Sequence, residues 1–186
     1  MKTSLVSIIA AFAFVYQTSG QAPVGPGAVK ITKVQPAVVK TPDIQFSGGT
    51  QKRSKPGDWL EVEVEFEVKA EEIDELTFAY TIMVEGKLLD GTVTHINIPK
   101  GRDRYSIMYV APRTLEKLSG GRPLSPASIQ NVWVVATRQG QPLDQMAFKN
   151  APIPPLPRIS GVVLNKAETP FAPLFWDRYE AIKVSR

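Results

Sequence analysis

Apolar and polar residues alternate most regularly over residues 59–69, WLEVEVEFEVK. Leucine, valine and phenylalanine take every second position, and glutamates take the four positions between them. A two-residue period places these two classes on opposite faces of a β-strand, whereas a helix would spread both around its axis. We therefore predict a strand whose apolar face lies in the core and whose glutamates face solvent.

The same period recurs along the chain and predicts seven strands in all. Their expected ranges are residues 29–34 continuing as 38–46 after a proline, 59–69, 76–84, 92–98, 104–110, 129–137 and 143–148. Residues 71–75 are expected to form an acidic turn, and Pro112 to begin a short helix that ends near Leu118. Strands of this number and spacing are typical of an immunoglobulin-like β-sandwich, so the predicted fold class is all-β.

The first 20 residues have the composition of a secretory signal peptide. Lys2 supplies a positive charge, residues 5–15 are apolar, and Thr18 and Gly20 are small residues where a signal peptidase reads the chain. The apolar run is shorter than the roughly 20 residues that span a bilayer. We therefore expect cleavage of this segment, which leaves a protein that is not integral to the membrane.

The rest of the chain divides into three predicted parts. Residues 21–28 form a flexible lead-in, residues 29–149 the sandwich, and residues 150–186 a C-terminal extension. The extension opens with residues 150–158, NAPIPPLPR, which favour an extended polyproline conformation. This stretch is either a connector laid over the sandwich or a docking peptide for a partner.

The chain contains no cysteine. This excludes disulfides, thiol nucleophiles and cysteine-based zinc sites. Small extracellular domains of animals usually carry disulfides, so secretion without them indicates the periplasm or cell surface of a Gram-negative-type bacterium.

Charge is unevenly distributed along the chain. Residues 58–90 contain 11 acidic and 2 basic residues, a net charge of −9, and the remainder contains 20 basic and 7 acidic residues, a net charge of +13. This pattern fits either a solvated sheet face with scattered lysines or a bipolar molecule. In a bipolar molecule the acidic face meets a basic surface on the same chain or on a neighbouring subunit, which favours self-association.

No catalytic motif accompanies the strands. Alternate glutamates on a strand lie about 6.6 to 6.8 Å apart, a separation that some glycosidases use, but a repeated row without a pocket is typical of a solvated face. His95 is the only histidine and is expected to be an ordinary strand residue. The sequence has no GxSxG elbow, no GxxxxGK[ST] loop and no DxDxDG-type calcium loop, so we predict no enzyme activity, cofactor or metal site.

Interaction surfaces are the remaining candidates. The second half of the chain combines basic side chains with two tyrosines: Lys100, Arg102, Arg104, Arg113, Lys117, Arg122, Tyr105 and Tyr109. Such a set either serves solubility or binds an anionic glycan or an acidic partner surface, and secretion argues against nucleic acid. The aromatic stretch of residues 170–176 must pack on its own sandwich or on a partner. The predicted interaction residues are Glu61, Glu63, Glu65, Glu67, Arg102, Arg104, Arg113, Phe171, Phe175 and Trp176.

Three segments resemble a known family: residues 57–67 (GDWLEVEVEFE), 107–118 (IMYVAPRTLEKL) and 165–180 (NKAETPFAPLFWDRYE). They are similar to small secreted proteins of the type IV pilus-like locus of Akkermansia and related Verrucomicrobia. The resemblance implies an immunoglobulin-like fold, similar to archaeal pilus or archaellum stator components, and brings no catalytic or ligand residues. It also implies a cell-envelope protein that belongs to a pilus assembly or assists it. The signal sequence lacks a type IV pilin leader, which argues against a pilin subunit.

The function predicted from all of this is a non-enzymatic, secreted or periplasmic interaction protein of such an assembly. Its expected partners are proteins of the cell envelope, including further copies of itself. The alternative is a carbohydrate-binding β-sandwich module that uses exposed tryptophan or tyrosine as sugar platforms.

Overall fold

The computed structural model describes residues 25, 27–43, 56–122 and 125–184. The predicted signal peptide and most of the predicted lead-in lie outside these residues. The described elements, in chain order, are β1 (Val29–Lys40), β2 (Asp58–Val84), β3 (Lys87–Val110), α1 (Pro112–Ser119), the 3-10 helix η1 (Pro126–Ser128), β4 (Ile129–Arg138), β5 (Gln141–Ala147), β6 (Arg158–Ser160), β7 (Val163–Asn165) and the 3-10 helix η2 (Lys166–Glu168). The predicted all-β class with one short helix is confirmed.

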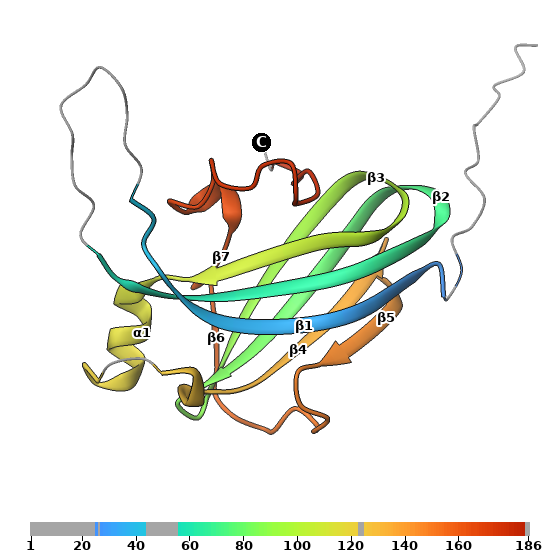
Figure 1. Cartoon of the computed structure of the whole chain (residues 1–186). Coiled ribbons are helices and arrows are strands. Elements are labelled where there is room, and N and C mark those ends of the chain that lie inside the picture. Colours follow the sequence, from blue (N-terminus) through green and yellow to red (C-terminus); the bar gives the residue numbers. More distant parts are fainter. Residues whose placement is uncertain (1–24, 26, 44–55, 123–124, 185–186) are drawn as a thin grey trace, which may run out of the picture.

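Two long strands, β2 and β3, form an antiparallel hairpin that folds over on itself (Figure 1). The first half of β2 pairs with β1 and with the end of β3, and the second half pairs with β4 and with the start of β3. The register between β2 and β3 shifts between Phe66 and Val68 and again before Glu72, and such irregularities let a strand pass from one sheet layer to another. One continuous sheet thereby supplies both layers of a β-sandwich.

We call the two layers by their edge strands. The β1 layer contains β1, residues 58–68 of β2, residues 101–110 of β3, and β7. The β5 layer contains β5, β4, residues 72–84 of β2, residues 87–99 of β3, and β6. The rings of Phe66 and Phe78, one from each half of β2, meet across the core with centroids 4.9 Å apart.

The core contains the apolar side of the alternating segment predicted from the sequence. Its five side chains are all buried: Leu60, Val62, Val64, Phe66 and Val68. They pack with inward residues of every neighbouring strand in a single cluster. Burial of valine, leucine or phenylalanine contributes roughly 1.5–3 kcal/mol per side chain, so this row is a main source of stability.

The acidic turn predicted at residues 71–75 is wrong. These residues stay in strand conformation inside β2, with Ile73 buried and Glu71 and Glu72 exposed. The acidic residues 71–75 therefore lie at the bend within β2 and not in a turn that ends the strand. The strand count stays at seven because two pairs of predicted strands fuse and the C-terminal extension adds β6 and β7.

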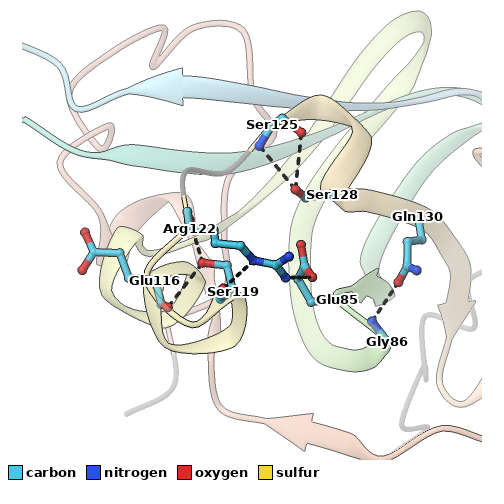
Figure 2. Close-up of polar contacts among 8 residues, drawn as sticks. All are labelled: Glu85, Gly86, Glu116, Ser119, Arg122, Ser125, Ser128 and Gln130. Atoms are coloured by element: carbon cyan, nitrogen blue, oxygen red, sulfur yellow. Dashed lines mark hydrogen bonds and ion pairs between the residues drawn. The ribbon is translucent and has the colours of Figure 1, made fainter.

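Polar contacts close the end of the sandwich beside α1 (Figure 2). Glu85 and Gly86 both have positive φ, as the two-residue turn between β2 and β3 requires. Arg122 donates to the carboxylate of Glu85 at 2.8 Å, and the Gly86 N–H donates to the Gln130 side chain at 2.9 Å. The predicted helix is confirmed as α1, and it buries Leu115 against the core.

Candidate interaction surface

The glutamate row of β2 lies on the outer face of the β1 layer. In the sheet register, Glu61 lies opposite Tyr109, Glu63 opposite Ile107 and Glu65 opposite Tyr105. The alternation of β2 places Trp59 on this same face, because it shares the odd parity of the glutamates. The face therefore combines carboxylates with aromatic rings.

The C-terminal tail, residues 163–184, covers this face within the same chain (Figure 1). It starts as β7 beside the end of β3, where Leu164 pairs with Tyr109. It later returns along β3, and Tyr179 forms a bridge to Tyr105 while Ile182 forms one to His95. The extension thus packs on its own sandwich, which is one of the two alternatives left open by the sequence.

An aromatic cluster anchors the first part of the tail. Phe171 is only 7% exposed and stacks on Tyr109 with ring centroids 4.5 Å apart and planes 4° from parallel. The same ring meets Trp59 edge-on at 5.5 Å, and the Trp59 indole N–H donates to Thr41 Oγ1 at 3.1 Å. Aromatic pairs of this kind add about 0.5–1.5 kcal/mol beyond the burial of their surface.

Glu63 anchors the second part of the tail. Arg178 donates to both of its carboxylate oxygens, at 2.9 and 3.2 Å, and the Tyr179 hydroxyl donates at 2.8 Å. The Arg178 guanidinium also lies 3.8 Å from the centroid of the Tyr105 ring. Two-pronged arginine–carboxylate contacts fix geometry as well as charge. Both carboxylate oxygens of Glu63 therefore bind the tail.

Partial burial between the tail and the sheet shifts the pKa values of acids on both. Burial raises the pKa of Glu61, and a hydrogen bond from Tyr109 opposes the rise while the charge of Glu63 adds to it. Burial likewise raises the pKa of Glu180, against the pull of the Arg104 guanidinium 3.3 Å away. These shifts come from the packing of the tail on the sheet.

The predicted basic residues do not gather into one patch. Basic residues from several parts of the chain pair with acids of residues 58–90, so the acidic region meets basic partners on its own chain. The pairs are Lys100–Glu71, Arg102–Glu67, Arg122–Glu85, Arg138–Asp74, Arg178–Glu63 and Lys183–Glu75. Arg113 lies exposed on α1, apart from the glutamate row. Exposed pairs contribute little individually, roughly 0–1 kcal/mol, so their main effect is on orientation.

Between the two anchors the tail turns outward and exposes a pair of aromatic side chains. Phe175 is 66% exposed and Trp176 is 79% exposed. Phe175 adopts a positive φ of 51°, a conformation that L-residues with bulky side chains rarely take. We call Phe175 and Trp176 the aromatic tip. The sequence grouped them with Phe171, but the structure separates an anchor from a tip.

A buried polar chain, which the sequence analysis missed, holds the tail from inside the sandwich. The Tyr80 hydroxyl donates to Ser106 Oγ at 2.7 Å, and Ser106 is 2.7 Å from His95 Nε2. His95 Nδ1 is 3.1 Å from the carbonyl oxygen of Glu180, which can only accept, so Nδ1 carries the proton. Burial lowers the pKa of His95 to about 4, which keeps the ring neutral. Strand parity was the available signal, because His95 shares the inward face of β3 with buried Val93.

A serine and a histidine in contact also occur in hydrolases, but here neither side chain reaches solvent. Ser106 and His95 are 0% and 1% exposed. A nucleophile must approach a substrate atom, and this pair is enclosed by the two layers. Its role in the fold is to fix the backbone of Glu180.

A groove of about 360 Å³ lies on the outer face of the β5 layer. Trp133 of β4, Met146 of β5 and the connecting residues Pro152 and Ile153 contribute to its lining. The Trp133 indole N–H donates to the carbonyl of Ala151 at 2.6 Å, which ties the connecting segment to the sheet. A second cavity of about 320 Å³ beside α1 is lined by charged residues that include Lys40 and Glu116.

Two further absences hold for the described residues, one of a metal-binding cluster and one of a membrane-spanning helix. Among them, no three histidine, cysteine or acidic side chains converge as a metal ion would require. In the same part of the chain, no helix has the length and apolar character needed to cross a membrane.

Comparison with known proteins gives a family and a fold. A protein-family model matches residues 20–186. A crystal structure of a protein from Akkermansia muciniphila superposes with a TM-score of 0.72 at 22% sequence identity, covering 85% of this chain and 94% of that one. At this identity the match shows a shared fold. The search of curated proteins found no match.

Proposed function

The chain belongs to the family of Ig-like proteins of the Akkermansia pilus-like locus, and from this premise we propose that it is a non-enzymatic interaction protein of a pilus-like cell-envelope assembly. It acts outside the inner membrane and contacts other proteins through its aromatic tip. The observation that carries the proposal is a tail anchored on both sides of two exposed aromatic residues, Phe175 and Trp176.

Exposed aromatic pairs of this kind favour a protein contact. Exposing large aromatic side chains to water has an unfavourable free energy that a binding partner removes by covering them. Tryptophan is also enriched among the interface residues that contribute most of the binding energy. Phe171 and Arg178 hold the ends of the turn, so the tip is presented with little freedom to lose on binding. A tip held in one conformation is more typical of a component of an assembly than of a tail that only keeps a protein in solution.

Several observations support export and the absence of catalysis. The family match begins at residue 20, where the predicted signal peptide ends, and the chain has no cysteine. Glu63, the most engaged carboxylate of the predicted row, anchors Arg178 and Tyr179. The Ser106–His95 pair is enclosed in the core. These features fit a binding role at the periplasm or cell surface.

Site-specific photo-cross-linking in the native envelope tests the proposal. A photoreactive amino acid is placed at Trp176 and, as a matched control, at exposed Lys117 on α1. We expect adducts with other envelope proteins to form at position 176 and to be at least several-fold scarcer at position 117. Equal yields at both positions, or no adduct at position 176, would contradict the proposal.

A carbohydrate-binding module is the second candidate, and exposed Trp176 is the observation that favours it. Trp59 and Trp133 are buried, so a change of tryptophan fluorescence during titration with envelope oligosaccharides would report on Trp176. A saturable spectral shift that is lost in Trp176→Phe would support the sugar platform. An unchanged spectrum would contradict a sugar-binding role for Trp176.

A further inference from the structure

The aromatic tip and the groove of the β5 layer lie on opposite outer faces of the sandwich. The tip belongs to a tail that packs on Tyr105, Tyr109 and Glu63 of the β1 layer. In β4, alternate residues Val132 and Val134 point into the core, so Trp133 faces outward from the β5 layer. Figure 1 shows the tail and the segment after β5 on opposite sides of the sheets. A tip therefore cannot reach the groove of its own chain.

The groove has a chemistry that suits an aromatic side chain. It runs between Trp133 and the proline-rich segment after β5, with Ile153 at its rim 42% exposed. Pro152 and Pro155 are exposed and have no backbone N–H to satisfy. Extended proline-rich segments and aromatic rings recognise one another because both offer rigid apolar surfaces that lose little entropy.

Charge at the borders of the two surfaces is complementary. Asp177 follows the aromatic tip directly and is exposed. Lys149 directly precedes Asn150, a residue of the groove lining, and it is exposed, with its Nζ 5.7 Å from the ring centroid of Phe148. Opposite charges at the rim of an interface orient the approach of two partners.

We infer that the occupant of the groove is a second copy of this chain: the Phe175–Trp176 tip of one copy docks in the groove of the next, against exposed Ile153 and the edge of Trp133, which is 9% exposed. This inference rests on the proposed function and names one partner for the tip. Because the two surfaces differ and lie on opposite faces, the contact is heterologous, so each copy offers one free tip and one free groove. Such a contact propagates into a chain of subunits or a ring, and not into a two-fold dimer.

Cysteine cross-linking tests the geometry directly, because the chain has no native cysteine. One variant carries Gln145→Cys at the groove, and the other carries Ala172→Cys near the tip; both sites are exposed. A short bis-maleimide linker is added to each variant alone and to their mixture, produced from the full-length sequence. We expect a dimer from the mixture and little from either alone. A Lys117→Cys variant replaces either partner as a control.

The tip itself is tested in the same format. Trp176→Ala in the Ala172→Cys chain should remove the cross-link and weaken self-association about tenfold or more by sedimentation. Val184→Ala is the matched control, since Val184 is another exposed apolar residue of the tail, 77% exposed, outside the tip. It should leave the cross-link unchanged.

Three results would overturn the inference: a monomer at every concentration, a dimer from Ala172→Cys alone, or equal loss of the cross-link in both alanine variants. A monomer that still forms photo-adducts with other envelope proteins at position 176 would overturn this inference and leave the proposed function standing. A chain that self-associates through tip and groove but forms adducts only with itself would sustain the inference and narrow the proposed function to self-assembly.

Discussion

Two regions of the same aromatic tail segment behave in opposite ways. Phe171 is buried between Tyr109 and Trp59, and five residues later Trp176 is 79% exposed. Both side chains are large and aromatic, so hydrophobicity alone does not decide which of the two packs on the sheet. The difference arises because Phe171 lies over the aromatic end of the β1 layer, whereas Arg178 and Tyr179 bind Glu63 and leave the turn between the two anchors outside. Anchoring on both sides is what makes an exposed tip a defined surface.

The largest expected effect is on the first anchor. Phe171→Ala removes a buried ring from its contacts with Tyr109 and Trp59, and we expect a loss of about 3 kcal/mol in the free energy of unfolding. Urea denaturation measures it. A loss below about 1 kcal/mol would mean that the stack does not hold the tail.

Acidification is expected to weaken the internal anchor at His95. The pKa of His95 is lowered by burial to about 4 from an ordinary value of 6.5, so between these values the unfolded chain binds a proton that the folded chain does not. This group's contribution is therefore complete above pH 6.5 and falls as the pH drops toward 4, by roughly 3 kcal/mol in total.

Urea denaturation at pH 7.5 and pH 4.5 measures that change. Glu61 of the sheet and Glu180 of the tail have raised pKa values and oppose this loss, because their folded forms take up protons first as the pH falls. The comparison is therefore made against His95→Gln, which should show a smaller loss between the two pH values. An equal loss in both proteins would remove His95 as the cause.

A smaller effect is expected at the second anchor. Glu63→Gln removes the charge that Arg178 contacts at 2.9 and 3.2 Å, and because the pair is partly exposed we expect a loss of only about 1 kcal/mol. Added salt should weaken the wild type more than the variant. Unfolding curves at low and high salt measure this, and an identical salt response would argue against the contact.

The smallest effect is expected at the tip. The double variant Phe175→Ala, Trp176→Ala should change the free energy of unfolding by no more than about 0.5 kcal/mol, since both side chains lie mostly in solvent. The same urea experiment measures it beside Phe171→Ala. A cost that approaches that of Phe171→Ala would show that the tip packs on its own chain.

The sequence predicted what depends on local periodicity. The two-residue period of β2 identified Leu60 to Val68 as core and the glutamates as the outer face. It failed at Glu71 and Glu72, because acidic residues also occur where a long strand bends, and the bend depends on partners far along the chain. Predicted strands 59–69 and 76–84 were therefore one element.

The candidate surface was less predictable for a similar reason. The sequence indicated that residues 170–176 must pack on something, but Phe171 and Trp176 are distinguished only by what the fold places beneath each. The contact between Arg178 and Glu63 spans 115 positions, so no local pattern could reveal it. The inward parity of His95 was visible, yet its link to Glu180 needed the returning tail.

Hydrogen exchange along residues 163–184 tests the central claim most directly. Backbone N–H groups on the returning part of the tail, at Glu180 and Lys183, donate to β3 carbonyls at 3.3 and 2.8 Å, so they should exchange slowly. The amide of Trp176, between the anchors, should exchange quickly. A tail docked on its own sheet with an exposed tip therefore predicts slow exchange in β7, which pairs with β3, fast exchange at the tip, and slow exchange on the returning part of the tail. Uniformly fast exchange across the tail would contradict the account.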